Sequence, residues 1–549
     1  MERLVTAQQM RNIENNIIQK FGLPAVVLME RAALFAADRI MDTQQKGKVL
    51  IACGMGNNGA DGMALARILA ERGFDVSFVT VGDQAKRTEL NKLQYHMIQE
   101  LSVHGKVQEI TMDALAAGTK RNPGEYAIIV DAILGIGVSR PLGGDFARLV
   151  RLLNDLAGFK LAMDIPTGIH TDTGQMLGSC FMADMTFCFG AVKTGLCMGT
   201  GKVAAGNIFC DSCGMVYQEV RMPIDDRPEA ESIAYSMTVQ DIRPFLGRSR
   251  GGNKGSFGKL GLIVGSRNVP GAAILASSAA YRSGAGYVRV LTQVKNRDLL
   301  MERMPEAVLQ LYEEPEEAQC FLASVVSFAD VLAVGCGIGT GPAQEKLLEL
   351  LFEEILKAES GESKEKSEEP AHAKVSKVLI LDADALTILA RCDALLQRVR
   401  KLPCITILTP HMKEFERLCG KTVAEVAEDR MEIARAFARQ HDVILVLKDA
   451  GTIVTDAAGR CMINRLGNDG MAVAGSGDVL CGIIASLLGQ NVRCRQSQGD
   501  AFWGTCAAVT LHAATGDVCS RRLGAHGMLP QDMTKQLPEV ILQIAGEPL

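Results

Sequence analysis

The chain alternates short apolar runs with longer segments of helical periodicity. In the first half these runs are almost continuously apolar, which is typical of strands buried on both faces of a parallel sheet. They cover residues 48–53, 76–81, 126–133, 159–165 and 185–190. Between the first two runs, an amphipathic helical pattern ends at Gly73, a residue type suited to helix C-termini. This strand–helix–strand order predicts a doubly wound, Rossmann-like α/β sheet.

The same alternation returns after a weaker stretch at 224–245, where charge rises and periodicity fades. We expect a linker there, followed by a helix near 271–284. The later strand-like runs cover 259–265, 287–292, 329–335, 377–383, 404–410 and 443–460, the last being two strands joined by a turn. We therefore predict two α/β domains, at residues 1–223 and 246–549.

Chain length and composition agree with two domains. The chain has 549 residues, whereas a single hydrophobic core stops growing at about 250–300 residues. Residues 357–377 are charged, serine-rich and almost free of large apolar side chains. Such a segment cannot bury enough surface to order itself, so we expect a flexible surface insertion.

Net charge and cysteine usage limit the partners and the compartment that we expect for this protein. A net charge of −5 gives no general attraction to nucleic acid or to anionic membranes. Apolar runs stay well below the roughly 18 residues of a membrane span, and the polar, acid-containing start resembles neither a signal peptide nor a transit peptide. Most of the 16 cysteines stand singly in apolar runs, as in a reducing compartment, and Cys210 and Cys213 suggest two unrelated thiols. We expect a soluble, cytoplasmic homo-oligomer.

Candidate chemistry in the first half gathers where strands end. The first strand leads into GMGNNGADG at 54–62, whose four glycines and paired asparagines exceed the needs of a turn. Similar clusters begin at Asp131 and Asp164, and Lys193 follows the last strand. A carboxylate and an ammonium in one crevice can act as general acid and base. Asn58, Asp131 and Thr167 offer oxygens to a hard cation. Turn capping explains any one aspartate but not the combination.

These motifs closely resemble the NAD(P)H-hydrate epimerase (YjeF N-terminal) family over about residues 1–215. GMGNNGADG, VDAILGIGVSRPLGG and MDIPTG carry the resemblance. It implies epimerisation at the hydrated carbon of a nicotinamide ring, proton transfer by Asp164 and Lys193, and K⁺ on Asn58, Asp131 and Thr167. The implied substrate contacts are Asn57, Asn58, Gly59, Asp61, Gly135, Ile136, Gly137, Val138, Ser139, Arg140, Pro141 and Asp164.

A second candidate site lies near the C-terminus, in GNDGMAVAGSGD at 467–478 before an apolar helix. Gly475 and Gly477 expose N–H groups at a helix start, where the helix dipole favours phosphate. Asp478 beside a phosphate can take the proton of an attacking hydroxyl. A helix cap is the alternative for Asp478, although a cap does not require the preceding Gly-Ser-Gly.

Other polar groups stand at strand ends of the second half. Lys448 begins a turn, 448–452, that can hold phosphate or sugar oxygens, and a plain hairpin is the alternative. His411 comes just after the strand 404–410. Asp382 and Asp384 stand at the end of the strand 377–383, where turn capping is a fair rival.

This half is similar to the ribokinase-like NAD(P)H-hydrate dehydratase (YjeF C-terminal) family over about residues 240–545. The resemblance rests on NKGSFGKLGLIVGS, PGAAILASSAAYRSGAG, MPEA, VGCGIG, LDADAL, LTPHMKEFERL, LKDAGT and GNDGMAVAGSGDVLCGIIA. It implies an ADP-dependent dehydration, with ATP in some members, that returns hydrated NADH or NADPH to the normal cofactor. Mg²⁺ is expected to offset the phosphate charge.

The resemblance also assigns residues, with Asp478 touching substrate as the base. The implied nucleotide contacts are Lys448, Asp449, Ala450, Gly451, Thr452, Asn468, Asp469, Gly470, Met471, Ala472, Val473, Ala474, Gly475, Ser476 and Gly477. The implied substrate contacts are Ala272, Gly339, His411, Met412, Lys413, Glu414, Phe415, Glu416 and Arg417. The sequence departs from the families at Arg31, Cys336 and Asp449, where Asn, Pro and Gly are usual.

Together the halves suggest one repair enzyme: the first interconverts the R and S hydrates, and the second consumes the S form, giving AMP and phosphate. Two alternatives remain open at this level. One is a ribokinase-like small-molecule (vitamin) kinase fused to a non-catalytic nucleotide-binding domain, since fold alone does not separate it from a dehydratase. The other is a binding or scaffold role for the N-terminal half.

Overall fold

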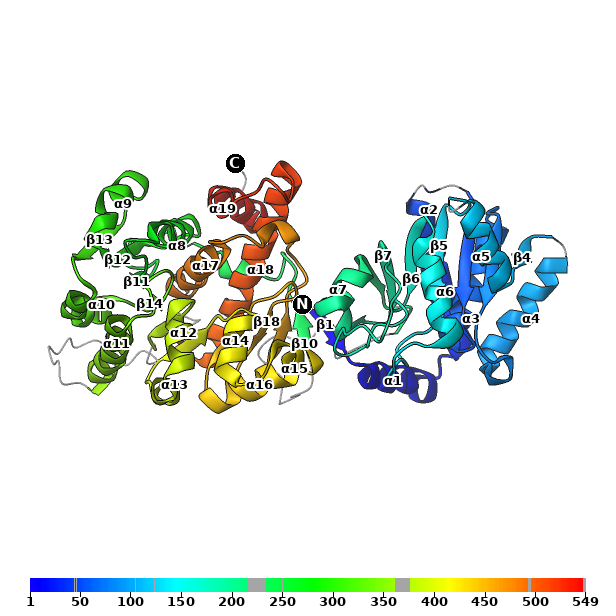
Figure 1. Cartoon of the computed structure of the whole chain (residues 1–549), viewed down its shortest axis with the longest axis horizontal. Coiled ribbons are helices and arrows are strands. Elements are labelled where there is room, and N and C mark those ends of the chain that lie inside the picture. Colours follow the sequence, from blue (N-terminus) through cyan, green and yellow to red (C-terminus); the bar gives the residue numbers. More distant parts are fainter. Residues whose placement is uncertain are drawn as a thin grey trace. The chain divides into compact units, whose positions relative to one another are not determined.

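The computed structural model describes the chain except residues 44, 46, 104, 123, 216–233, 249, 361–375, 492–494 and 547–549. The chain divides into two compact units, Arg3–Pro228 and a second one made of Met1–Glu2 with Glu229–Leu549. Each unit is an α/β fold with its own sheet and its own apolar clusters (Figure 1). Across the described residues, no helix is both long and apolar enough to cross a membrane.

The N-terminal unit is built on a parallel sheet with the strand order β4-β3-β2-β5-β6-β7-β9. The order reverses between β2 and β5, which makes the sheet doubly wound, as predicted. The strands are β2 (Val49–Cys53), β3 (Val76–Thr80), β4 (Val107–Glu109), β5 (Ile128–Ala132), β6 (Phe159–Met163), β7 (Met185–Phe189) and β9 (Asn207–Asp211). The two edge strands, β4 and β9, were not predicted because their mostly exposed residues lack a continuous apolar run.

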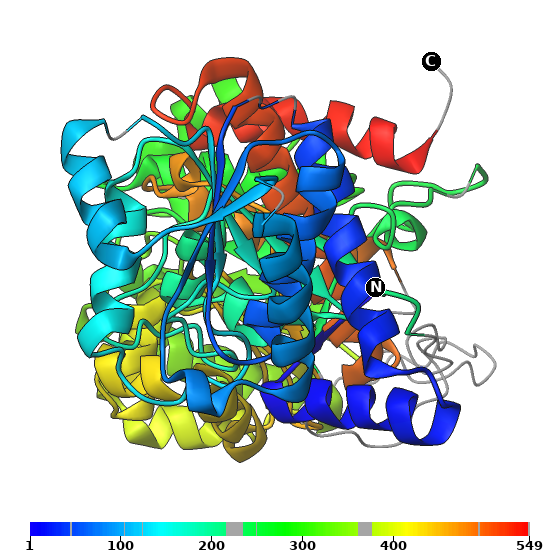
Figure 2. The same ribbon diagram turned by 90° about the vertical axis from the view of Figure 1, so that its right-hand side faces the viewer.

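Helices cover both faces of this sheet, blue on one side and cyan on the other in Figure 2. One face carries α2 (Ala25–Asp42), α3 (Asn57–Glu71) and α4 (Glu89–Val103), and the other carries α5 (Met112–Arg121) and α6 (Gly144–Asp155). The unit also contains α1 (Ala7–Asn16), a π-helical turn (Ile17–Phe21), α7 (Gly199–Ala205), and β1 (Glu2–Val5), which pairs with β8 (Val192–Lys193).

The C-terminal unit has a larger sheet, in which neighbouring strands from β13 through β12, β11, β14, β15 and β16 to β17 are all parallel. β18 is antiparallel to β17 and to β19, and β10 is parallel to β19. The strands are β10 (Ala234–Ser236), β11 (Lys259–Ile263), β12 (Tyr287–Gln293), β13 (Val308–Tyr312), β14 (Val331–Val334), β15 (Val378–Leu381), β16 (Ile405–Leu408), β17 (Ile444–Leu447), β18 (Ile453–Thr455) and β19 (Cys461–Ile463).

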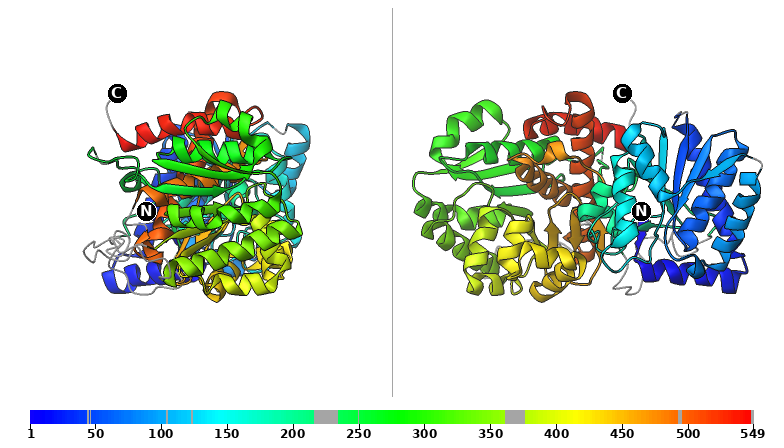
Figure 3. Two further views of the ribbon diagram at one scale, coloured as in Figure 1. Left: turned by 90° about the vertical axis from the view of Figure 1, so that its left-hand side faces the viewer. Right: turned by 45° about the vertical axis from the view of Figure 1, so that its right-hand side comes forward.

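Helices also cover both faces of the larger sheet (Figure 3, left). The apolar sides of α8 (Pro270–Arg282), α17 (Ser476–Gln490), α18 (Gln498–Leu523) and α19 (Pro530–Ala545) join the strands in one core cluster. The remaining helices are α9 (Arg297–Arg303), α10 (Leu322–Phe328), α11 (Pro342–Ser360), α12 (Asp384–Arg391), α13 (Asp393–Val399), α14 (Met412–Cys419), α15 (Val423–Glu428) and α16 (Arg430–His441). The α/β class predicted for both halves is confirmed.

The predicted linker, 224–245, needs a correction in its second half. Residues 224–233 lie outside the described residues, but Ala234–Ser236 form β10 against β19, and Met237 and Ile242 are buried in the core. A strand of three residues is too short to show periodicity, so the sequence suggested a linker. Of the predicted insertion at 357–377, residues 357–360 end α11, and 361–375 lie outside the described residues.

Candidate active sites

The N-terminal unit has a cavity of about 860 Å³ at the point where its strand order reverses. In doubly wound sheets, ligands bind in the crevice at this switch point. Predicted substrate contacts that line it are Asn57, Asn58, Asp61, Gly135, Ile136, Gly137, Val138, Ser139, Arg140, Pro141 and Asp164. Gly59 is not among the lining residues. A Cβ there would lie 2.0 Å from the Gly54 carbonyl oxygen, so Gly59 permits close packing beneath the loop.

An ion pair between a buried lysine and an aspartate that lines the cavity lies at this crevice. Asp164 directly follows β6 and has a left-handed φ of +67°. The Lys193 ammonium, 1% exposed, contacts Asp164 Oδ1 and donates to the Phe189 carbonyl oxygen at 2.9 Å. Burial alone lowers the pKa of Lys193, but the Asp164 carboxylate more than offsets this and the pKa is raised. The lysine is therefore held protonated beside the aspartate.

The three residues predicted to hold K⁺ lie at the ends of β2, β5 and β6. Asp131 is fully buried and accepts hydrogen bonds from Thr167 N at 2.7 Å and Thr167 Oγ1 at 2.8 Å. Burial raises the pKa of Asp131 to about 6, and no cationic side chain pairs with it among the described residues. The amide oxygen and nitrogen of Asn58 are buried without a hydrogen-bond partner in that part of the chain. A buried carboxylate and an unused amide oxygen fit a hard cation.

Two further acids belong to this site. Glu14, on α1, lines the cavity, and sequence reasoning missed it because α1 looks like an ordinary polar surface helix. Burial raises the pKa of Glu14, and the Asp164 charge raises it further. Burial and the Asp164 charge raise the pKa of Asp61 as well. The crevice thus brings three carboxyl groups around one ammonium.

Arg31 departs from the family pattern without entering the cavity. Its side chain is exposed, and its guanidinium reaches Gly214, where an added Cβ would lie 1.6 Å from Arg31 Nη1. The neighbouring Met29 and Ala32 line the cavity instead. Arg31 is therefore not part of the lining of the crevice.

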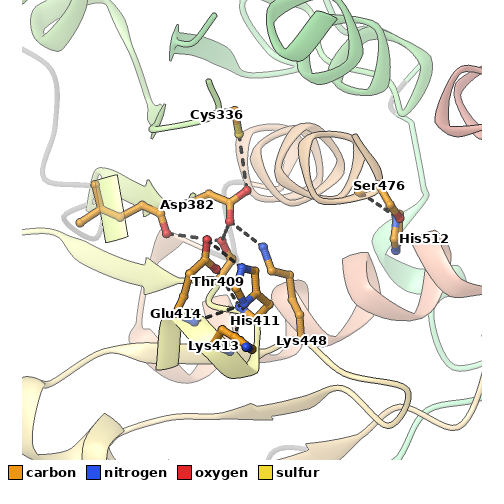
Figure 4. Close-up of polar contacts among 10 residues, drawn as sticks. Cys336, Asp382, Thr409, His411, Lys413, Glu414, Lys448, Ser476 and His512 are labelled. Atoms are coloured by element: carbon orange, nitrogen blue, oxygen red, sulfur yellow. Dashed lines mark hydrogen bonds and ion pairs between the residues drawn. The ribbon is translucent and has the colours of Figure 1, made fainter. Parts of the chain in front are cut away.

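The C-terminal unit collects polar groups at the carboxyl ends of β14, β15, β16 and β17 (Figure 4). Lys448 Nζ lies 2.7 Å from Asp382 Oδ1, and Thr409 Oγ1 donates to the same oxygen at 2.7 Å. Asp382 is 1% exposed. Burial alone lowers the pKa of Lys448, yet Asp382 and Glu414 raise it overall. A protonated lysine at this edge can bind an anion.

Asp478 faces this pair from the start of α17. Gly475, with φ +99°, is the N-cap residue of that helix, so Asp478 is not its cap. A Cβ on Gly477 would lie 3.4 Å from Lys448 Nζ and 3.8 Å from Asp382 Oδ2. Burial raises the pKa of Asp478 to about 6, with the Asp382 charge adding to the effect. This place therefore combines the N-terminus of α17 with the Lys448 ammonium and the Asp478 carboxylate.

Interactions that the sequence did not indicate hold the two predicted nucleotide-binding segments. In 468–477, Asn468 Nδ2 donates to Asp517 Oδ1 at 2.9 Å, and Ser476 Oγ lies 3.4 Å from His512 Nε2. Burial lowers the pKa of His512 to about 4, so its ring stays neutral. Both partners lie on α18, which reads as a plain apolar helix. In 448–452, the Asp449 carboxylate is ion-paired with Arg430, which neutralises it.

The structure divides the predicted substrate contacts of 411–417 between two sides of α14. His411 is the N-cap, with Nδ1 accepting from Glu414 N at 3.2 Å, and Lys413 and Arg417 are exposed. The Phe415 ring is fully buried against Phe437, with centroids 5.2 Å apart, so it belongs to the core. A run of consecutive helical residues cannot face one ligand, because its side chains point all around the axis.

The two predicted contacts outside that helix lie near the same edge. Ala272, on α8, is 2% exposed, and its methyl group would be 3.0 Å from a Cβ on Gly337. Gly339 has a φ of +92°, and its N–H donates to Asp384 Oδ2 at 2.8 Å. Asp384 thus orders the glycine loop after β14.

These folds and sites define a two-site α/β enzyme that combines an acid–base crevice with an anion-binding centre. Family models match at residues 260–539, described as NAD(P)H-hydrate dehydratase, and at 25–195, described as YjeF-related protein N-terminus. The chain belongs to the family of bifunctional NAD(P)H-hydrate repair enzymes.

Relatives with that name match almost end to end. The one from Moorella thermoacetica is 31% identical over 99% of this chain and 97% of its own. The one from Escherichia coli is 31% identical over 97% of this chain and 93% of its own. A solved ADP/ATP-dependent NAD(P)H-hydrate dehydratase from Bacillus subtilis, co-crystallised with ATP and Mg²⁺, is 26% identical over 57% of this chain and 99% of its own, with a TM-score of 0.46.

Proposed function

We propose that this chain repairs hydrated NADH and NADPH in two coupled steps. The N-terminal unit interconverts the R and S hydrates, and the C-terminal unit dehydrates the S form at the expense of ADP or ATP. The observation that carries the proposal is Asp478, a half-buried carboxylate that faces the Lys448–Asp382 pair from a helix N-terminus. Family membership and the buried Asp164–Lys193 pair support the epimerase step.

For the dehydration, the hydroxyl group of the hydrate is a poor leaving group. Asp478 takes its proton, and the oxygen attacks the terminal phosphoryl group of the nucleotide, which releases AMP when ADP is used. Lys448 and the N–H groups at the start of α17 stabilise the phosphate charge. Electrons from the ring nitrogen then expel phosphate, and loss of a proton from the neighbouring carbon restores the double bond. The products are NAD(P)H, AMP and phosphate.

For the epimerisation, Lys193 and Asp164 supply an acid and a base at one place. Protonation of the hydroxyl lets it leave as water with electrons from the ring nitrogen. Water then returns to the other face of the planar ring carbon and gives up a proton to the carboxylate. The cavity of about 860 Å³ has the volume of a typical small-molecule site.

Two cations belong to the proposal. Asn58, Asp131 and Thr167 would hold K⁺, whose charge would balance the buried Asp131 carboxylate. Mg²⁺ would offset the charge of the nucleotide phosphates. At the C-terminal site Asp382 is tied to Lys448 and Asp384 to Gly339 N. We therefore expect Mg²⁺ to be bound chiefly through the phosphates.

The kinase alternative has less support, because a vitamin kinase needs no epimerase unit and the relatives match over both halves. The cytoplasmic location and the homo-oligomer stay predictions. Light scattering of the purified chain tests the oligomer: a mass of about one chain, whatever the concentration, contradicts it.

The deciding experiment incubates the full chain with hydrated NADH and either ADP or ATP. We expect the near-ultraviolet absorbance of the reduced nicotinamide to return, together with one AMP per NADH when ADP is used. In a control without nucleotide, the absorbance should not change. No recovery with either nucleotide would exclude the dehydratase, and phosphorylation of a vitamin alcohol would favour the kinase.

A further inference from the structure

A cluster of sulfur and oxygen ligands lies directly beneath the nucleotide-binding edge of the C-terminal unit. Cys336 is fully buried, and Cys481 and Asp382 are each 1% exposed. The two Sγ atoms and a carboxylate oxygen all lie within 4.8 Å of one another. The Cys336 thiol donates to Asp382 Oδ2 at 3.5 Å (Figure 4). No other group of three such ligands stands this close in the described part of the chain.

Asp478 lies next to the cluster. It lies one helical turn before Cys481 on α17, so both side chains face the same side of the helix. Its carboxylate lies beside the Cys336 thiol. The two thiols and the Asp382 carboxylate thus lie together, and Asp478 lies beside them at the start of α17.

This donor set suits a soft or borderline divalent cation. Zn²⁺ prefers four ligands in a tetrahedron, with Zn–S distances of about 2.3 Å, which places two thiolates roughly 4 Å apart. The sulfur atoms lie within 4.8 Å of each other, which is near the separation that this geometry requires. Mg²⁺ prefers oxygen ligands, so the nucleotide's own cation does not compete for the thiolates.

The charge of the buried site also permits binding. The Lys448 ammonium neutralises Asp382 through Oδ1, while Oδ2 faces Cys336. When one divalent cation enters, the two thiols lose two protons, so the net charge of the cluster does not change. The Born cost of adding a bare charge to the interior is thereby avoided.

We propose that Cys336, Cys481 and Asp382 form a binding site for a thiophilic divalent cation such as Zn²⁺, with Asp478 as the fourth ligand. Binding removes Asp478 from the substrate hydroxyl and blocks dehydration. The inhibition rests on the proposed role of Asp478, whereas the binding rests on the cluster alone.

Metal binding by the full chain tests the site directly. With thiols kept reduced by a phosphine, the protein is titrated with Zn²⁺ or Co²⁺ alone. We expect thiolate-to-cobalt charge-transfer absorption in the wild type, and one bound ion fewer in C336A and in C481A. Cys519→Ala, which removes another buried thiol of the same unit, should keep that ion. Equal stoichiometry and absorption in wild type, C336A and C481A would overturn the proposal.

Inhibition is measured separately with hydrated NADH and ADP in excess Mg²⁺. We expect saturating Zn²⁺ to lower the dehydration rate of the wild type at least tenfold, and a chelator to restore this rate. C336A should keep most of its dehydration rate when Zn²⁺ is added. A wild type that binds the ion but keeps its rate would overturn the inhibition. A wild type that binds the ion and has no dehydratase activity would contradict the proposed function and leave the metal site standing.

Discussion

At the scale of single residues, both sites share one feature: a lysine ammonium lies against a carboxylate at a strand end. Lys193 lies on Asp164 in one unit, and Lys448 lies on Asp382 in the other. Each carboxylate offsets the burial that would otherwise lower the pKa of its lysine. Both lysines thus carry their charge before any ligand arrives, which lowers the reorganisation needed during the reaction.

The pair Asp164–Lys193 makes a prediction about stability and activity together. Removing one partner leaves a buried charge uncompensated, which costs about 3–5 kcal/mol. We expect D164N and K193M each to lower the melting temperature of the N-terminal unit, and the double variant D164N/K193M to recover part of the loss. All three should lack epimerase activity. A double variant no more stable than the singles would contradict the coupling.

Asp478 makes a prediction about activity alone. Its pKa is raised in the fold, so its ionised form is disfavoured there and Asn should not destabilise the unit at neutral pH. We expect D478N to slow dehydration by about 10²–10⁴, with an unchanged melting temperature and unchanged epimerisation by the same chain. Wild-type turnover in this variant would reduce Asp478 to a structural residue.

The same carboxyl group predicts the pH dependence. Burial raises the pKa of Asp478 to about 6, and a base works only when it is deprotonated. Dehydration should therefore fall as the pH drops through about 6, losing tenfold per unit below it. The measurement is kcat/KM for the hydrate against pH. A profile that stays flat well below this pH would show that another group is the base.

At the scale of elements, each site is made by neighbouring strands that end at one edge. Parallel strands carry their C-terminal residues to the same side, so β14, β15, β16 and β17 bring together side chains that stand far apart in sequence. The glycine-rich segment that leads into α17 then closes over this edge. Two of its glycines, Gly475 and Gly477, have different tasks.

These tasks can be separated by two alanine variants. Gly475 has a φ of +99°, and a Cβ would lie 2.6 Å from Leu275 Cδ1, so G475A should cost about 1–3 kcal/mol and weaken nucleotide binding. Gly477 is inside α17, where alanine is the better helix former by about 1 kcal/mol. G477A should keep or raise the melting temperature while its methyl group, near Lys448 Nζ, raises the nucleotide KM about tenfold. Equal effects of both variants on stability would contradict this division.

At the scale of the whole molecule, one chain carries both the epimerase and the dehydratase site. If the dehydratase takes only the S hydrate, an equal mixture of R and S reveals the epimerase. The wild type should convert the mixture in one phase. D164N/K193M should convert about half quickly and the rest at the slow rate of spontaneous epimerisation. Single-phase conversion by that variant would show that the dehydratase accepts both forms.

The sequence by itself determined the α/β class, the principal strands and several of the loops that line the N-terminal cavity, whereas its assignment of nucleotide and substrate contacts in the C-terminal unit stays a prediction. These features are local: a buried parallel strand is a continuous apolar run, and a phosphate or substrate loop needs its glycines, asparagines and aspartates side by side. Glu14, His512 and Asp517 were missed because they lie on helices without motifs. Phe415 was assigned to substrate because a motif does not record which way a helical side chain points.

Only the tertiary structure decided which charges meet. Asp164 lies on Lys193, Asp382 on Lys448, and Cys336 faces Cys481 because separate strands and helices end at common edges. Such contacts depend on strand order and helix packing, and neither leaves a periodic signal in the chain. The pKa values of Asp131 and Asp478 depend on burial for the same reason: the surroundings that remove water from a carboxylate are assembled from distant parts of the sequence.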